Sequence, residues 1–198
     1  MKMKKNKGLL VVVLLLLFLC TACGNTTSDD KSNSGVKTNE KENKEKEVKK
    51  LSFTCENNYV KIETPDTWAQ YPGKDKLNKD SCLELVGLNN KEDKYLLIIS
   101  EDKNQFKSYN AWFDIVYGTA KNSYELDDSQ LRRSDENGLN TRFIEKDLEI
   151  QGEKVYLQLY FLETNKYYTQ VLMWTDNSNK ATLSTEFRDI AYSLKEVE

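Results

Sequence analysis

Histidine is absent from all 198 residues of this chain. Histidine is the commonest general base and the commonest metal ligand, and it activates the nucleophile in Ser/His and Cys/His pairs. Its absence excludes those pairs and every histidine-based metal centre. Residues 51–198 also lack a Cys-x-x-Cys motif, the usual arrangement of a redox-active pair of thiols, and the chain contains no internal repeat. No arrangement of residues typical of an enzyme is left, so we predict neither enzymatic activity nor a cofactor.

Long apolar segments are also missing, with one exception near the N-terminus. Residues 8–19 are almost wholly apolar and follow four lysines within residues 1–7. Twelve residues of helix extend about 18 Å, whereas the hydrocarbon core of a bilayer is about 30 Å thick. A basic start followed by a short apolar run is typical of a secretory signal peptide rather than of a membrane span. We therefore predict that residues 1–22 are a signal peptide.

The segment after the apolar run resembles the lipobox of bacterial lipoproteins, in which small residues precede an invariant cysteine. Thr21 and Ala22 fit the small positions, Cys23 fits the modified cysteine, and Cys20 departs from the usual leucine. The resemblance implies cleavage before Cys23 and a lipid anchor on its thiol; several acyl chains hold a protein firmly on a membrane where one does not. The alternative is an ordinary cleaved signal peptide that leaves an unmodified thiol.

Residues 23–50 are predicted to be the lipidated cysteine and a disordered, charged tether, because the segment has too few apolar side chains to offset chain entropy. Gly24 gives no signal for retention at an inner membrane, and the abundant Lys, Asn and Glu indicate an AT-rich Gram-positive genome. The expected location is thus the outer face of the cytoplasmic membrane.

Acidic residues outnumber basic residues after the tether. The whole chain has a net charge of −3, residues 1–22 carry four lysines and no acid, and residues 23–50 carry one net positive charge. Residues 51–198 therefore carry a net charge of −8. An acidic domain repels phosphate backbones and anionic head groups, which argues against a nucleic-acid partner and against direct adhesion to lipid.

Hydrophobic periodicity in residues 51–198 predicts a single α+β domain. Alternating apolar residues indicate strands, and a three- to four-residue spacing indicates two amphipathic helices, the first with Ser108 as its N-cap and the second with Asn177 or Ser178. The expected fold is a mostly antiparallel sheet of six or seven strands packed by two main helices. The predicted strands are 51–55, 59–64, 81–88, 94–100, 141–150, 155–164 and 167–175, and the predicted helices are 108–122 and 179–197.

This order of elements resembles PsbP-like domains. The resemblance is carried by Tyr59-Val-Lys-Ile-Glu-Thr-Pro65-x-x-Trp68 at the start, and by Phe187-x-x-Ile190-x-x-Ser193-Leu194 in the last helix. It covers most of residues 51–198 and implies an antiparallel sheet sandwiched by helices. It also implies binding or scaffolding rather than catalysis, and no catalytic residues come with it.

Cys55 and Cys82 are the two cysteines of the domain. Outside the cell membrane such a pair can persist as a disulfide, which would stabilise the domain by about 3.5 kcal/mol in the chain-entropy model. Two buried thiols are the alternative, and the residues leave both open.

Three carboxylates, Glu145, Asp147 and Glu149, alternate along one predicted strand and therefore project from one face. Carboxylates in such a row can bind a hard cation such as calcium, although a solvated sheet face has the same pattern. We keep them as weak candidates for a metal site.

Aromatic residues supply the candidate binding patch. Tyr156 and Tyr160 share one face of a predicted strand, and Trp174 lies on the next strand. If that face is uncovered, these rings suit contact with a protein or a glycan; if the final helix covers it, they belong to the core. The sequence thus predicts a non-catalytic binding or scaffold module for an envelope protein or cell-wall component. The alternatives are a small-molecule or calcium-binding surface lipoprotein and a carboxylate-based hydrolase.

Overall fold

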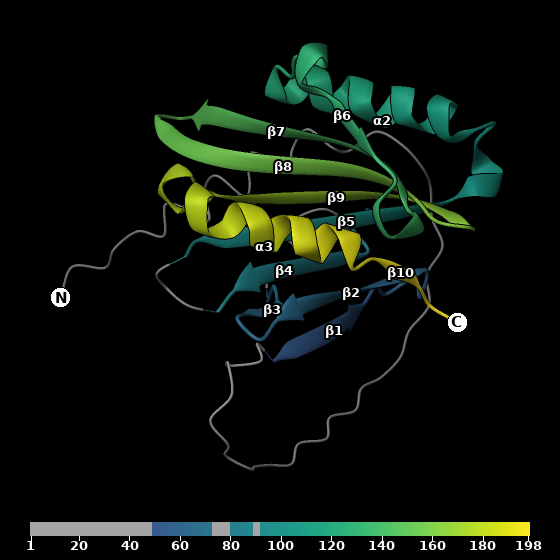
Figure 1. Ribbon diagram of the computed structural model, residues 1–198, viewed down its shortest axis with the longest axis horizontal. Helices are drawn as coiled ribbons and strands as arrows, with labels where there is room; N and C mark the ends of the chain where they lie inside the picture. The colour runs from purple at the N-terminus through teal and green to yellow at the C-terminus, as the bar shows by residue number, and fades with distance from the viewer. Residues whose placement is uncertain (1–48, 73–79, 89–91) are drawn as a thin grey trace, which may run out of the picture.

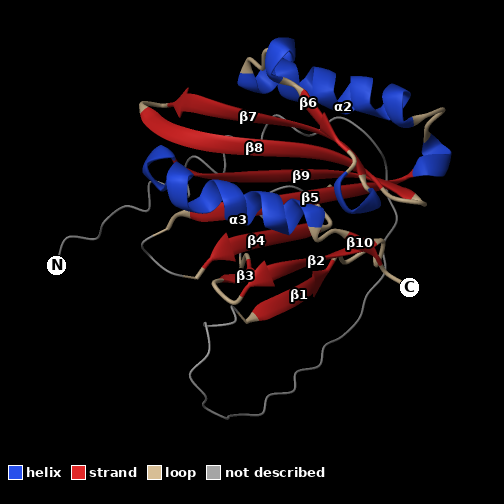
Figure 2. Ribbon diagram, in the orientation of Figure 1, coloured by secondary structure: helices blue, strands red, loops and turns tan. Residues whose placement is uncertain are grey.

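The computed structural model describes residues 49–72, 80–88 and 92–198 (Figures 1 and 2). The predicted signal peptide, Cys23 and nearly all of the predicted tether lie outside these residues. The strands are β1 (Lys50–Thr54), β2 (Val60–Pro65), β3 (Trp68–Gln70), β4 (Leu83–Gly87), β5 (Lys94–Asp102), β6 (Arg132–Ser134), β7 (Asn140–Ile150), β8 (Glu153–Glu163), β9 (Tyr167–Asp176) and β10 (Lys195–Glu196). The α-helices are α2 (Tyr109–Tyr124) and α3 (Lys180–Tyr192), and short 3-10 turns include η2 (Lys103–Gln105), η4 (Glu136–Gly138) and η5 (Asn177–Asn179).

Two antiparallel sheets are formed within the described part of the chain. The large sheet has seven strands in the order β3-β4-β5-β9-β8-β7-β6, and the small sheet has three in the order β1-β2-β10. The meander β7-β8-β9 has long, continuous pairing, from Asn140 opposite Glu163 to Ile150 opposite Glu153 in its first hairpin. The expected α+β class and mostly antiparallel pairing are confirmed, but the predicted strands 51–55 and 59–64 belong to the small sheet, and β3 and β6 complete the seven strands of the large one.

Helix α2 covers one face of the large sheet. Its buried side chains recur at three- and four-residue steps and pack against the side chains of β8 and β9 that face it. Ser108 caps the helix as predicted, with its side-chain oxygen accepting a hydrogen bond of 3.2 Å from the backbone N–H of Ala111. Such a cap satisfies one of the N–H groups that a helix start leaves unpaired. The apolar side chains of α2 therefore find their partners on a single sheet face.

Helix α3 and the small sheet together cover the opposite face (Figure 1). Phe187 and Ile190 of α3 share one apolar cluster with Ile62 of β2 and with Leu83 and Leu85 of β4. Because successive residues of a strand point to opposite faces, the strands between the two helices must be apolar on both sides. This explains why residues 95–99 of β5 form a continuous apolar run.

The C-terminal helix ends earlier than its periodicity predicts. Helix α3 stops at Tyr192, and the Ser193 hydroxyl then accepts a hydrogen bond of 2.8 Å from the backbone N–H of Glu63. The next residues form β10, in which Lys195 lies opposite Lys61 of β2. Backbone groups that the long helix would have paired locally are paired instead with a distant strand. The prediction of one helix over 179–197 was therefore wrong at its C-terminal end.

The predicted start of that helix also needs correction. Asp176, rather than Asn177 or Ser178, provides the side-chain cap, accepting a hydrogen bond of 2.8 Å from the backbone N–H of Ser178. This cap begins the 3-10 turn η5, from which α3 continues. Strand β3 was missed altogether, since three residues after a proline give too short a pattern to recognise.

Candidate functional site

The predicted aromatic patch is buried. The exposed fractions of Tyr156, Tyr160 and Trp174 are 0%, 1% and 3%. The three rings also do not share a face, because Trp174 pairs across the strands with Leu157, which points away from Tyr156 and Tyr160. The prediction of a binding patch at these residues was therefore wrong. Helix α3 covers the two tyrosines, and the third ring belongs to the core on the α2 side.

The two buried tyrosines belong to a chain of hydrogen bonds beneath α3. The Tyr160 hydroxyl donates to the Gln158 side-chain oxygen at 2.9 Å, and the Gln158 amide donates to the Tyr156 hydroxyl at 2.7 Å. Tyr156 in turn donates to Glu145 at 2.8 Å, and the Gln158 amide reaches the backbone carbonyl of Ser184 in α3 at 3.1 Å. Burial raises the pKa of both tyrosines. These polar groups serve to fix the helix on the sheet.

Trp174 stacks on Tyr95, with ring centres 5.3 Å apart. Burial raises the pKa of Tyr95 to about 12, and the negative charge of Asp93 adds to the shift. The indole N–H of Trp174 is buried and has no hydrogen-bond partner among the described residues.

The row of carboxylates on β7 does not form a cation site. Glu145 accepts the hydrogen bond from Tyr156, and Asp147 lies 2.8 Å from the ammonium of Lys180 in α3. Glu149 is exposed at the far end of the strand. No group of three side chains suited to a metal ion occurs in the parts of the chain that the structure describes. The prediction of a metal site at these carboxylates was therefore wrong. They contact Tyr156, Lys180 of α3 and the solvent.

Cys55 and Cys82 lie in the same apolar cluster on the α3 side of the large sheet, and both are buried thiols in the structure. Their segments run side by side, because the backbone N–H of Glu56 donates to the carbonyl of Cys82 at 2.9 Å. The disulfide between them stays a prediction.

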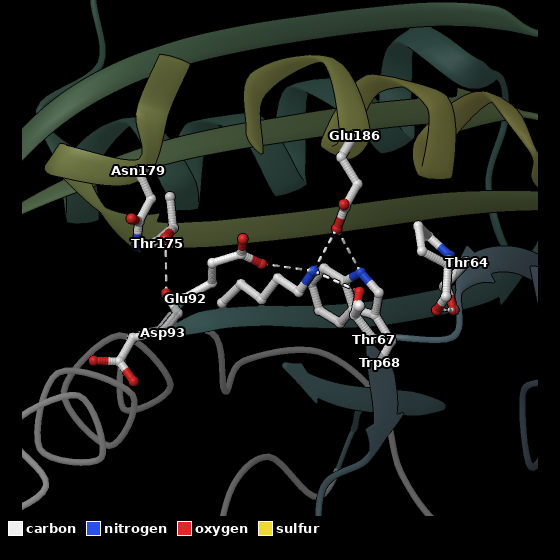
Figure 3. Close-up of polar contacts among 10 residues, drawn as sticks. Thr64, Thr67, Trp68, Glu92, Asp93, Thr175, Asn179 and Glu186 are labelled. Carbon is white, nitrogen blue, oxygen red and sulfur yellow. Dashed lines mark hydrogen bonds and ion pairs between the residues drawn. The ribbon is translucent and has the colours of Figure 1, made fainter. Parts of the chain in front are cut away.

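A buried lysine, which the sequence did not reveal, joins α3 to the β3-β5 end of the large sheet through Glu186 and Thr67, both labelled in Figure 3. The side chain of Lys94 on β5 is 0% exposed. Its ammonium donates to the Thr67 hydroxyl at 2.8 Å and to Glu186 of α3 at 2.7 Å, and Glu92 lies 3.4 Å away. A buried charge is tolerated only when it is paired and hydrogen-bonded. Both conditions are met here.

Trp68 completes this Lys94 cluster, which consists of Thr67, Trp68, Glu92, Lys94 and Glu186. The indole N–H of Trp68 donates to the same Glu186 oxygen at 2.8 Å, and the Lys94 ammonium lies 4.9 Å from the centre of the Trp68 ring. A Cβ added to Gly87 on β4 would come within 2.6 Å of the Lys94 side chain. Only glycine leaves room there for the lysine stem. The signal that could have revealed the cluster is a lysine in register with inward-facing Leu96 and Ile98.

A polar pocket opens at one end of the large sheet. Its volume is about 480 Å³, within the range of roughly 300–1,000 Å³ typical of small-molecule sites. Its walls come from four separate segments, namely η2, the stretch from η4 to the start of β7, the β8-β9 turn and the residues that follow α3. The lining residues are Lys103, Asn137, Gly138, Leu139, Asn140, Glu163, Thr164, Asn165, Leu194, Lys195 and Glu196.

Hydrogen bonds across the pocket hold these segments together. The carboxylate of Glu163 accepts from Lys103 and from the Asn140 amide, each at 2.7 Å. Glu196 accepts from the Thr164 hydroxyl at 2.7 Å and from the backbone N–H of Lys166 at 2.5 Å. The pocket is therefore a built feature of the fold rather than a gap between loosely placed loops.

Solved structures with the same architecture identify the fold. The chain is similar to cyanobacterial PsbP (CyanoP) from Synechocystis sp. PCC 6803, with 14% identity and a TM-score of 0.51 over 75% of this chain and 93% of that one. The domain has a PsbP-like fold. The Ran-binding protein Mog1p of Saccharomyces cerevisiae is also similar, with 6% identity and a TM-score of 0.52 over 76% of this chain and 97% of Mog1p. A protein from Bacteroides thetaiotaomicron VPI-5482 gives 9% identity and a TM-score of 0.52, over 74% of this chain and 48% of that one.

No protein-family model and no curated protein matches the sequence. At the identities above the likeness concerns the fold alone, so no functional residue of those proteins is carried over to this PsbP-like domain. Among the described residues no helix is long and apolar enough to cross a membrane. A function for the domain therefore has to be argued from its own pocket and surfaces.

Proposed function

We propose that this protein is a lipoprotein anchored through Cys23, whose PsbP-like domain binds an envelope protein or cell-wall component without catalysing a reaction. The observation that carries the proposal is the pocket at the end of the large sheet. It is lined by amides, a hydroxyl and paired charges from four segments, and every carboxylate in it already accepts a hydrogen bond from the protein. Such a site presents contacts to a ligand but no unengaged acid or base to a reaction.

Two further observations support the proposal. Residues 1–24 combine a basic start, an apolar run and a cysteine preceded by small residues. One protein of the same fold, Mog1p, is a Ran-binding protein, so a PsbP-like fold can serve as a binding module.

The anchor is tested by feeding growing cells a clickable fatty acid and comparing two variants. We expect Cys23→Ala to abolish labelling and to release the protein from the membrane. Cys20→Ala is the matched control, because it removes a neighbouring cysteine of the predicted signal peptide and should leave labelling intact. Labelling that survives in Cys23→Ala would overturn the anchor.

Binding is tested by cross-linking the full-length protein in living cells and identifying what is joined to it. We expect a reproducible partner that is lost when residues 51–198 are deleted. A well-expressed, anchored protein that captures no envelope protein and no wall material would contradict the proposed function.

A further inference from the structure

The chemistry of the pocket at the end of the large sheet narrows the class of its ligand. The ligand class derived from this chemistry rests on the proposed function, in which the domain is a binding module.

The charges of the pocket are balanced and already engaged. Two lysines, Lys103 and Lys195, face two glutamates, Glu163 and Glu196, so the lining carries no net charge. Lys103 is 2.7 Å from Glu163, and Lys195 is 3.5 Å from Glu63 outside the pocket. A lining with no net charge favours neither an anionic nor a cationic ligand. A neutral polar ligand is the class that fits it best.

Hydrogen-bonding capacity remains on the amides. Asn137 and Asn140 each use their NH₂ group within the protein, toward the Tyr192 carbonyl at 3.2 Å and toward Glu163 at 2.7 Å. Their side-chain oxygens accept nothing from the described residues, and the exposed Asn165 makes no side-chain hydrogen bond within that part of the chain. An amide oxygen accepts and an amide NH₂ donates, so together they suit hydroxyl groups, which do both.

The pocket also has an apolar side. Leu139 and Leu194 are buried in its lining. Beside it, Tyr167 stacks on Tyr59 with ring centres 4.2 Å apart, and the Tyr167 carbonyl accepts from the backbone N–H of Thr164 at 3.0 Å. Both tyrosine rings are half-buried. The exposed part of these rings offers an apolar surface beside the pocket for the C–H groups of a sugar, whereas the two leucines are too buried to do so.

We infer that this pocket binds a neutral saccharide, with the amides of Asn137, Asn140 and Asn165 taking its hydroxyl groups. The wall of the site is shaped before the ligand arrives. Asn137 has a φ of 55° and Gly138 a φ of 74°, a left-handed bend that suits a glycine and an asparagine. Pre-formed walls reduce the ordering that a ligand must impose on binding.

The test is a titration of the purified full-length protein followed by amide chemical shifts. The probes are chitobiose and cellobiose as neutral disaccharides and alanyl-alanine as a zwitterion of comparable size. The detergent must lack a sugar head group, because an alkyl glycoside would itself compete for the pocket. We expect saturable shifts at residues 137–140 and 163–165 with at least one disaccharide and none with the dipeptide.

Two variants separate the pocket from the rest of the surface. Asn165→Ala removes an amide that holds no described contact, and we expect it to weaken binding about three- to tenfold, the effect of one hydrogen bond. Asn122→Ala removes an exposed amide from α2, on the other face of the large sheet, and is expected to leave the affinity unchanged. Equal thermal melting of both variants and the parent establishes that folding is unaltered.

Each outcome decides the inference. Saturable dipeptide binding without sugar binding would replace the saccharide by a zwitterionic ligand, and shifts with no probe would overturn the site. If a sugar binds, the next step is to test whether the protein sediments with isolated cell walls. Sedimentation that added chitobiose reverses assigns the wall glycan as the source of the ligand. Sugar binding without sedimentation assigns a free sugar. A cross-linked protein partner together with a silent titration would leave the proposed function intact and refute only the saccharide.

Discussion

Replacing Glu186 by leucine would deprive the buried ammonium of Lys94 of its nearest carboxylate. The two groups are 2.7 Å apart, and the lysine side chain is 0% exposed. Glu92 would remain at 3.4 Å, and Thr67 would still accept at 2.8 Å. Removing one partner of a buried ion pair costs about 3–5 kcal/mol, because the charge that stays behind is buried and has lost its main compensation.

The variant also removes the acceptor of a second buried donor. The indole N–H of Trp68 donates to Glu186, and a buried donor that loses its partner costs about 1–3 kcal/mol. Since Glu92 can compensate in part, we expect Glu186→Leu to lower the free energy of unfolding by about 3–5 kcal/mol in total. For a domain of this size, that corresponds to a fall in melting temperature of about 6–20 °C.

Replacing the lysine instead should be milder. Lys94→Met keeps most of the buried stem and leaves no buried charge, because the Glu186 side chain is 24% exposed and still accepts from Trp68. We expect a loss of about 1–2 kcal/mol, largely from the contact with the Trp68 ring. The double variant Lys94→Met/Glu186→Leu should then be more stable than Glu186→Leu alone, since it removes the stranded charge.

The measurement is guanidinium unfolding of the full-length protein followed by far-UV circular dichroism, a signal that does not depend on Trp68. Asp147→Asn is the matched control, because its ion pair with Lys180 joins the same helix to the sheet but is exposed, at 51% and 42%. We expect that control to cost less than about 1 kcal/mol. If Glu186→Leu cost no more than Asp147→Asn, or if the double variant were the least stable, the reasoning about the buried charge would be refuted.

Three further predictions concern titration and thiols. Burial raises the pKa of Glu101 above its ordinary 4.5. The parent protein should therefore lose stability relative to Glu101→Gln as the pH rises through that raised pKa. Urea unfolding from about pH 4 upward measures this, and the same pH dependence of stability in both proteins would contradict it. Burial raises the pKa of Tyr95 and Tyr117 from 10.0 to about 12, so the stability of the domain should fall as the pH rises from 10 to 12. In a pH titration, the tyrosinate absorbance of the native protein should rise at a higher pH than that of the denatured chain. Cys55 and Cys82 are buried, so an alkylating agent should modify them only after denaturation. If neither cysteine is alkylated in denatured protein that has not been reduced, the two form a disulfide instead.

Much of the fold was predictable from residue spacing. The period of α2, its Ser108 cap and the three strands of the meander were all visible as patterns in neighbouring residues. Local patterns failed where distant backbone partners decided the outcome. The last residues of the predicted C-terminal helix became β10 because β2 offered them hydrogen bonds, and no spacing within residues 179–197 reveals that partner.

The candidate site was less predictable. Tyr156 and Tyr160 looked like a surface patch because a strand's alternation shows which residues share a face but not what covers that face. Helix α3 covers it. The pocket combines four segments that are far apart in the sequence, none with a pattern of its own. Such a site exists only once the end of β5, the start of β7 and the end of β8 lie together at one end of the large sheet.

The sequence alone established the absence of histidine chemistry, the acidic charge of the domain, the α+β class and the presence of two helices and the long strands, because these depend on composition and on contacts between near neighbours. It also carries the predicted anchor at Cys23. The tertiary structure alone decided that Lys94 is buried between Glu186 and Trp68, that the aromatic residues are core, and that a charge-balanced pocket lies at the sheet end. Those features depend on which distant segments pack together, and burial is a property of the packed chain rather than of any one residue.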